Sequence, residues 1–184
     1  ESATTDGLSY EVSQQDVERD LKDLGGPNSG LLGEVLSACR SAIPPEAVAL
    51  VESHVGKTYS AITGALAHTG NFFQIVAAFC REQREGGNGR SEYAQQLRIV
   101  PGIRAQSGWQ EVEIAWDNLA ASVKPVVEAL SKLAGGLSDL AEYDIDERDE
   151  RMVALTSAAR ELDKFAAESN ALVSKPDSQK IYWI

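Results

Sequence analysis

The sequence predicts a mainly α protein: an antiparallel bundle of about four to six helices, with a minor β element near residues 93–100 and a terminal strand. Three observations lead to this prediction. Apolar residues recur at spacings of three and four over long stretches, which is typical of helices that bury one face. Clusters of glycine and proline separate these stretches. The 184 residues suffice for one domain with a sizeable core, and no apolar run approaches the roughly 18–20 residues that span a bilayer.

Two helices are expected before residue 45. Ser13 is a candidate N-cap because Asp16 follows it three residues later, in a variant of the capping box. The helix that it opens should stop at the Gly-Gly-Pro sequence of residues 25–27. A second helix is expected from about Ser29 to Ala42, because two prolines at 44 and 45 end it and open the next one.

The third element is expected to run from about Glu46 to Arg84 as one long helix. Glycines weaken this run, and residues 68–71 are the place where it would break into two helices. The expected buried stripe consists of Val48, Val51, Val55, Tyr59, Ile62, Leu66, Phe73, Val76 and Cys80.

The second half of the chain combines two helices with two extended segments. Alternation over residues 93–100 predicts a strand, and a helix should start near Ser107 and carry Trp109, Val112, Trp116, Leu119, Val123, Val126, Leu130 and Leu133. The last helix carries a coiled-coil-like series: Met152, Leu155, Ala159, Leu162, Ala166, Ser169 and Val173. Residues 181–184 have strong strand propensity, and we expect them to be poorly paired here or to belong to a sheet of a neighbouring domain.

Composition restricts the function. A net charge of −11 argues against a free-standing nucleic-acid-binding domain, although it leaves room for a local basic patch. Cys39 and Cys80 lie in apolar helical pattern and are expected to be buried free thiols, which fits a reducing cytoplasm. Two cysteines cannot supply the four thiolates of an iron–sulfur cluster.

The sequence offers no complete catalytic or metal site. Gly56-Lys57-Thr58 resembles the end of a phosphate-binding loop, but the required upstream glycine is absent and the segment is predicted to be mid-helix. His54 and His68 are fourteen residues apart, about 21 Å along a helix, which is too far for shared zinc coordination. The acidic stretch of residues 142–149 lacks the glycine of a calcium loop and is interpreted as a solvated helix entry.

The basic segment of residues 81–104 is the best candidate site. It holds five arginines against three glutamates, a local charge of +2 within an acidic chain. Arginines near an aromatic side chain can contact a nucleic-acid backbone and stack a base. The candidate nucleic-acid-binding residues are Arg90, Tyr93, Arg98 and Arg104, and ordinary surface arginines are an equally open interpretation.

Three stretches carry a family resemblance. ESATTDGLS at residues 1–9 resembles the segment just after the DEAH box of DinG-type helicases. Residues 93–104 with WQEVEIAWDNL at 109–119 resemble the middle of the insertion that follows that box. DSQKIYWI at 177–184 resembles the strand by which that insertion re-enters the first motor domain. The order and spacing of the three stretches match those of the family, so the resemblance covers nearly the whole chain. Residues 1–184 are therefore expected to be a single helical domain excised from a larger helicase between the DEAH box and the next motor motif.

The resemblance implies the arch domain of an XPD-related, superfamily 2, ATP-dependent DNA helicase that moves 5′ to 3′ and acts in DNA repair. Its partners would be single-stranded DNA and the motor domains of the parent protein, with no membrane involved. ATP and Mg would be bound by the parent, and none of the family's catalytic or cofactor residues falls in this chain. An insertion of this kind should bring its two ends together at one base.

Two further interpretations come from other classes of protein. One is a helical protein-interaction or scaffold module that docks a partner helix and has no nucleic-acid role. The other, a bundle enzyme with carboxylate-bound metals, lacks the Glu-x-x-His pairs that it would need.

Overall fold

The computed structural model describes residues 13–86, 97–176 and 182–184, and over these ranges the chain is mainly helical, as predicted. The described helices are α1 (Gln14–Asp23), α2 (Gly30–Ala42), α3 (Pro45–Gly86), α4 (Pro101–Arg104), α5 (Ser107–Asp139) and α6 (Arg148–Val173). Two short strands, β1 (Arg98–Ile99) and β2 (Tyr182–Trp183), form an antiparallel pair. None of the described helices is both long and apolar enough to cross a membrane.

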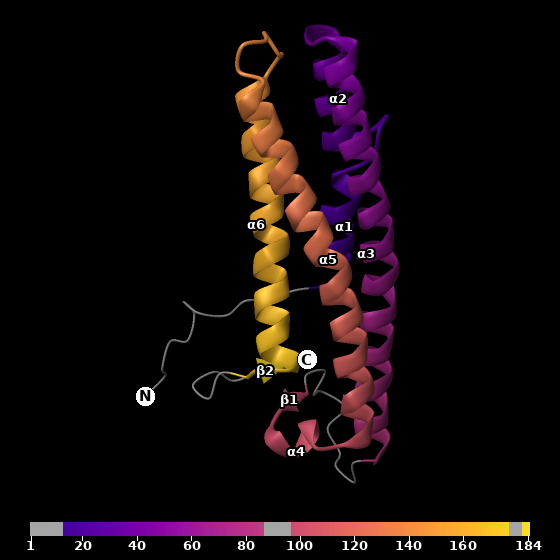
Figure 1. Cartoon of the computed structure of the whole chain (residues 1–184). Coiled ribbons are helices and arrows are strands. Elements are labelled where there is room, and N and C mark those ends of the chain that lie inside the picture. Colours follow the sequence, from indigo (N-terminus) through magenta and orange to yellow (C-terminus); the bar gives the residue numbers. More distant parts are fainter. Residues whose placement is uncertain (1–12, 87–96, 177–181) are drawn as a thin grey trace, which may run out of the picture.

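The first two helices are joined by a turn that requires glycine. Ser13 Oγ accepts a hydrogen bond from the Asp16 amide at 3.1 Å, which confirms the predicted N-cap of α1. After α1, Gly25 adopts φ of +70°, and a Cβ there would lie 2.0 Å from the carbonyl oxygen of Ser29. The turn lets α1 and α2 follow one another along α3, against which both helices pack (Figure 1).

The third helix is continuous, as predicted. Its 42 residues extend about 63 Å, and residues 68–71, the possible break, lie within it. Most of the buried positions alternate spacings of three and four: Val55, Thr58, Ile62, Ala65, Thr69, Phe72, Val76 and Phe79. This spacing is that of a coiled coil. Cys80 is buried next to Phe79, as predicted.

The predicted buried stripe of α3 is partly wrong. Tyr59 is 48% exposed, and four other predicted positions are only half-buried: Val48, Val51, Leu66 and Phe73. Their places in the core are taken by Ala65, Phe72 and two threonines. The Thr58 and Thr69 hydroxyls each donate to the carbonyl four residues earlier, both at 2.8 Å, so burial leaves neither hydroxyl unsatisfied.

The long helices α3, α5 and α6 form the body of the bundle. Figure 1 shows α5 running antiparallel to both, and it packs against each of them. The buried residues predicted for α5 are confirmed from Trp109 to Leu133, and the series on α6 is confirmed apart from half-buried Met152 and Ala166. Trp116 of α5 makes edge-to-face contacts with Phe72 of α3 and Phe165 of α6, at centroid distances of 5.7 and 5.9 Å.

The terminal strand corrects another expectation. Residues 182 and 183 are not poorly paired within the chain: they pair with β1, with Tyr182 opposite Ile99 and Trp183 opposite Arg98. Leu97 and Ile184 exchange backbone hydrogen bonds of 2.6 and 2.9 Å. The physical reason is the α5–α6 hairpin, which brings the segment before α5 beside the segment after α6. The predicted β element is confirmed at Arg98–Ile99, and its residues 93–96 lie outside the described ranges.

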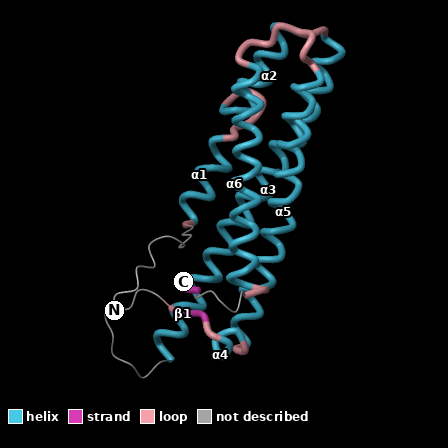
Figure 2. Tube along the Cα trace, turned by 90° about the vertical axis from the view of Figure 1, so that its left-hand side faces the viewer, coloured by secondary structure: helices cyan, strands magenta, loops and turns pink. Residues whose placement is uncertain are grey.

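The bundle has two different ends. We call the end that carries β1, α4, β2 and the adjoining ends of α3, α5 and α6 the base, and the opposite end, with the α5–α6 loop and the α2–α3 corner, the tip (Figures 1 and 2). Ile184 lies at the base. Glu1 lies outside the described residues, so the expected meeting of the two ends stays a prediction.

Candidate nucleic-acid interface

The predicted site residues that the structure describes, Arg98 and Arg104, both lie at the base. Arg98 is in β1 and its side chain is exposed. The basic segment is described at residues 81–86, which hold two arginines and two glutamates, and at residues 97–104, which hold Arg98 and Arg104 and no acidic residue. Arg90 and Tyr93 lie outside the described residues, so their part in a site is untested by the geometry.

Arg104 differs from Arg98 because its side chain is engaged within the protein. One guanidinium nitrogen, Nη1, donates to the Val173 carbonyl oxygen at 2.7 Å. The guanidinium carbon lies 5.4 Å from the Trp109 ring centroid and 5.7 Å from that of Tyr182. The second terminal nitrogen, Nη2, is buried without a hydrogen-bond partner among the described residues. These contacts reduce what Arg104 can offer to a phosphate.

Burial also affects the ionisation of this group. Loss of hydration lowers the pKa of the Arg104 guanidinium, and the nearby Tyr182 and Glu113 side chains oppose that shift. Arginine stays protonated in proteins at physiological pH, so Arg104 remains a cation. Of these two arginines, exposed Arg98 is therefore the better placed to contact a nucleic-acid backbone.

The sequence did not indicate the partners of Arg104. Trp109 was expected in the core and is fully buried, but its indole nitrogen also donates to the Val173 carbonyl at 3.3 Å. Tyr182 was expected in an unpaired strand. No local pattern could reveal the contacts with Val173, because they join residues more than sixty positions apart in the chain.

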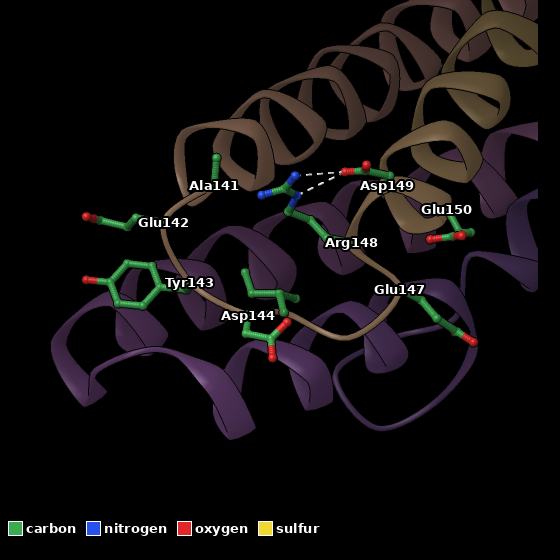
Figure 3. Close-up of a pocket in the computed structure, with 9 residues that line it drawn as sticks. Ala141, Glu142, Tyr143, Asp144, Glu147, Arg148, Asp149 and Glu150 are labelled. Carbon is green, nitrogen blue, oxygen red and sulfur yellow. Dashed lines mark hydrogen bonds and ion pairs between the residues drawn. The ribbon is translucent and has the colours of Figure 1, made fainter.

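The tip carries the opposite charge. Residues 142–150 hold six carboxylates and a single arginine, and all of these residues except Asp146 line an open pocket of about 480 Å³. Figure 3 shows the carboxylates that line the pocket spread around the loop, with Arg148 paired to Asp149 at 3.0 Å. Within the described ranges no group of His, Cys, Asp or Glu side chains is arranged to hold a metal ion.

A second depression, of about 470 Å³, follows the surface between α5 and α6. Small and β-branched side chains such as Ala120, Val123 and Ala166 line it, with Lys124 and Asp163 among its charged residues. At one end the Trp116 indole nitrogen donates to the Asn170 side-chain oxygen at 3.3 Å. The groove is open and holds no cluster of catalytic groups among the residues that line it.

The motif at Gly56-Lys57-Thr58 lies within the long helix. Lys57 is exposed there, while Thr58 is buried and its hydroxyl donates to a backbone carbonyl. A phosphate-binding loop needs successive backbone amides that point at the phosphate, and in mid-helix those amides already bond within the helix. The interpretation of Lys57 as a solvated helix residue fits this placement.

Comparison of the chain with protein-family models, with curated proteins and with solved structures yields no match.

Proposed function

We propose that the chain is the arch domain of an ATP-dependent 5′–3′ DNA helicase, which helps to enclose or guide single-stranded DNA over the first motor domain. In this proposal the chain is an accessory part of an enzyme. ATP and Mg belong to the motor domains of the parent protein, and no residue of this chain is assigned to catalysis.

The observation that carries the proposal is the separation of charge along the bundle. The base presents exposed Arg98 on a segment, 97–106, that lacks acidic residues, while the tip loop concentrates carboxylates. A phosphate backbone is attracted to the first and repelled by the second. Such an arrangement would direct single-stranded DNA to the base, where β2 also lies. It would also allow DNA contact by a chain whose net charge is −11.

The test compares two arginines in the intact protein that contains this chain. Arg98→Ala removes the exposed arginine of the base, and Arg160→Ala removes an exposed arginine on α6, away from the base, as the matched control. Arg104 is left unchanged, because its loss would disturb the packing of the base as well as the charge. Affinity for a labelled single-stranded oligonucleotide is measured across salt concentrations.

We expect Arg98→Ala to flatten the dependence of log affinity on log salt by about 0.7, the value for one phosphate contact on a single strand. Binding at 0.1 M salt should weaken by about three- to five-fold. Arg160→Ala should leave both quantities unchanged. Equal affinities and equal salt dependences for the two variants would show that Arg98 is an ordinary surface arginine. That result would favour the protein-interaction module, whose candidate surface is the α5–α6 groove.

A further inference from the structure

Four separate segments of the chain meet at the side chain of Arg104. Arg104 is the last residue of α4, Trp109 lies in the first turns of α5, Val173 ends α6 and Tyr182 begins β2. The guanidinium is within cation–π distance of both aromatic rings and donates to the Val173 carbonyl. We call these four residues the latch.

The latch satisfies groups that would otherwise be left without partners. The last carbonyls of a helix have no partner within that helix, and they carry the negative end of its dipole. The Val173 carbonyl accepts from both Arg104 and Trp109, at 2.7 and 3.3 Å. A cation at this position is favoured by the dipole, and the two rings replace part of the water that it loses.

The β ribbon contacts this arrangement through Tyr182. A two-stranded ribbon is marginal in water when nothing packs against it. β1 and β2 are each two residues long, and Tyr182 lies against the guanidinium that also caps α6. The ring of Tyr182 also packs against the hydrophobic core, to which Ile99 of β1 belongs, so Arg104 is one of the contacts that hold the ribbon in place.

We infer that the latch fastens the C-terminal strand to the bundle, so that opening of the β1–β2 ribbon and fraying of the last turn of α6 are one event. A displacement of β2 is passed through Arg104 to α6 and, through Trp109, to the start of α5. Arg104 is a positioning residue in this device. The latch consists of described residues alone, and its action does not require that the chain bind DNA.

Amide hydrogen exchange of the 184-residue chain, followed residue by residue by NMR, tests this inference. The ribbon is reported by the Leu97 and Ile184 amides, which bond each other's carbonyls, and the end of α6 by the Ser174 amide, which bonds the Asn170 carbonyl. The tip is reported by the Ile43 amide, bonded to the Cys39 carbonyl. Arg104→Met keeps a long apolar side chain and removes the cation and its donors.

In Arg104→Met we expect exchange at the ribbon and at the end of α6 to accelerate together, by about 10- to 100-fold, with the tip unchanged. Arg104→Lys, which keeps the charge without the planar fork, should fall between this variant and the wild type. Arg160→Met should match the wild type. Unchanged exchange at the base, or acceleration at the ribbon without acceleration at the end of α6, would overturn the inference.

A second variant keeps the test decisive if Arg104→Met does not fold. Tyr182→Leu leaves the helical core intact and removes only the outer ring of the latch. It should accelerate exchange of the ribbon and of the Ser174 amide alike. Where both single variants fold, their effects should be less than additive in the double variant, because each breaks the same latch. Fully additive effects on the exchange rates, or an exchange rate of the Ser174 amide that Tyr182→Leu leaves unchanged, would show that the ribbon and the end of α6 open independently.

Discussion

The three long helices meet at Trp116, and its replacement by alanine would remove a side chain that contacts all of them. The side chain belongs to α5 and is 1% exposed. Its ring meets Phe72 of α3 and Phe165 of α6 edge to face, and its indole nitrogen donates to the Asn170 side chain. One substitution therefore loosens both of the interfaces that α5 makes.

The expected loss follows from these contacts. Truncation of a buried tryptophan to alanine costs about 3–5 kcal/mol through lost burial and the cavity left behind. Each edge-to-face pair contributes about 0.5–1.5 kcal/mol beyond burial, so the cost should lie near the upper end of that range, about 4–5 kcal/mol. Trp116→Phe keeps a ring between the two partners and should cost about 1–2 kcal/mol. The free energy of unfolding of a domain is about 5–15 kcal/mol, so the Trp116→Phe variant should stay folded and the Trp116→Ala variant should be close to unfolding.

Urea denaturation followed by circular dichroism measures these free energies, with the slope of the unfolding free energy against urea as a check on two-state behaviour. Ile114→Ala is the matched control, because Ile114 lies two residues away on the same helix and is 55% exposed. Its effect should stay within about 0.5 kcal/mol. A cost below about 1 kcal/mol for Trp116→Ala, or equal costs for Trp116→Ala and Ile114→Ala, would refute the assigned core.

Three other predictions concern backbone, thiols and pH. Gly25→Ala should lower the free energy of unfolding by at least about 2 kcal/mol, because Gly25 has a positive φ and a Cβ there would clash with the Ser29 carbonyl. Gly136→Ala should raise the free energy of unfolding by up to about 1 kcal/mol, because a Cβ at this helical position would lie in open space. Thermal melts of the two variants measure both effects. Burial raises the pKa of both cysteine thiols, so a thiol reagent at pH 7 should modify the folded protein at least roughly 100-fold more slowly than the unfolded chain, and fast modification would contradict their burial. The Ser13 hydrogen bond, helped by Arg19, holds the pKa of the Asp16 carboxyl below its ordinary value of 3.8. The stability that this carboxylate adds is therefore present above pH 3.8 and is lost as the pH falls through the lowered pKa. The difference in unfolding free energy between wild type and Ser13→Ala should shrink on acidification, and a constant difference would count against the cap.

The helices could be predicted wherever bulky apolar residues mark the buried face. On α5 every predicted position from Trp109 to Leu133 is buried, because leucine, valine and tryptophan occupy the core there. On α3 the core includes alanine and threonine, whose types do not distinguish an inward from an outward face. The apolar spacing therefore predicts that Tyr59 is buried, but its side chain lies outside the core and against the turn at Gly26.

The base could not be assembled from the sequence, because its contacts join residues far apart in the chain. The strand propensities of residues 93–100 and 181–184 were both recognised, yet nothing local indicated that the two segments would pair. The α5–α6 hairpin makes them neighbours. Arg104 illustrates the same limit: it was chosen for its charge, while its contacts with Val173 and Tyr182 follow from tertiary structure alone.

Site-directed photo-crosslinking in the intact protein tests the central claim most directly. A photoreactive amino acid is placed at position 98 of the base in one variant and at position 142 of the tip in another, since both side chains are exposed. Each variant is then irradiated with labelled single-stranded DNA. The proposal predicts a crosslink from position 98 and none from position 142. DNA binding without a crosslink at 98, or equal crosslinking from both positions, would contradict the assignment of the base as the face that meets the strand.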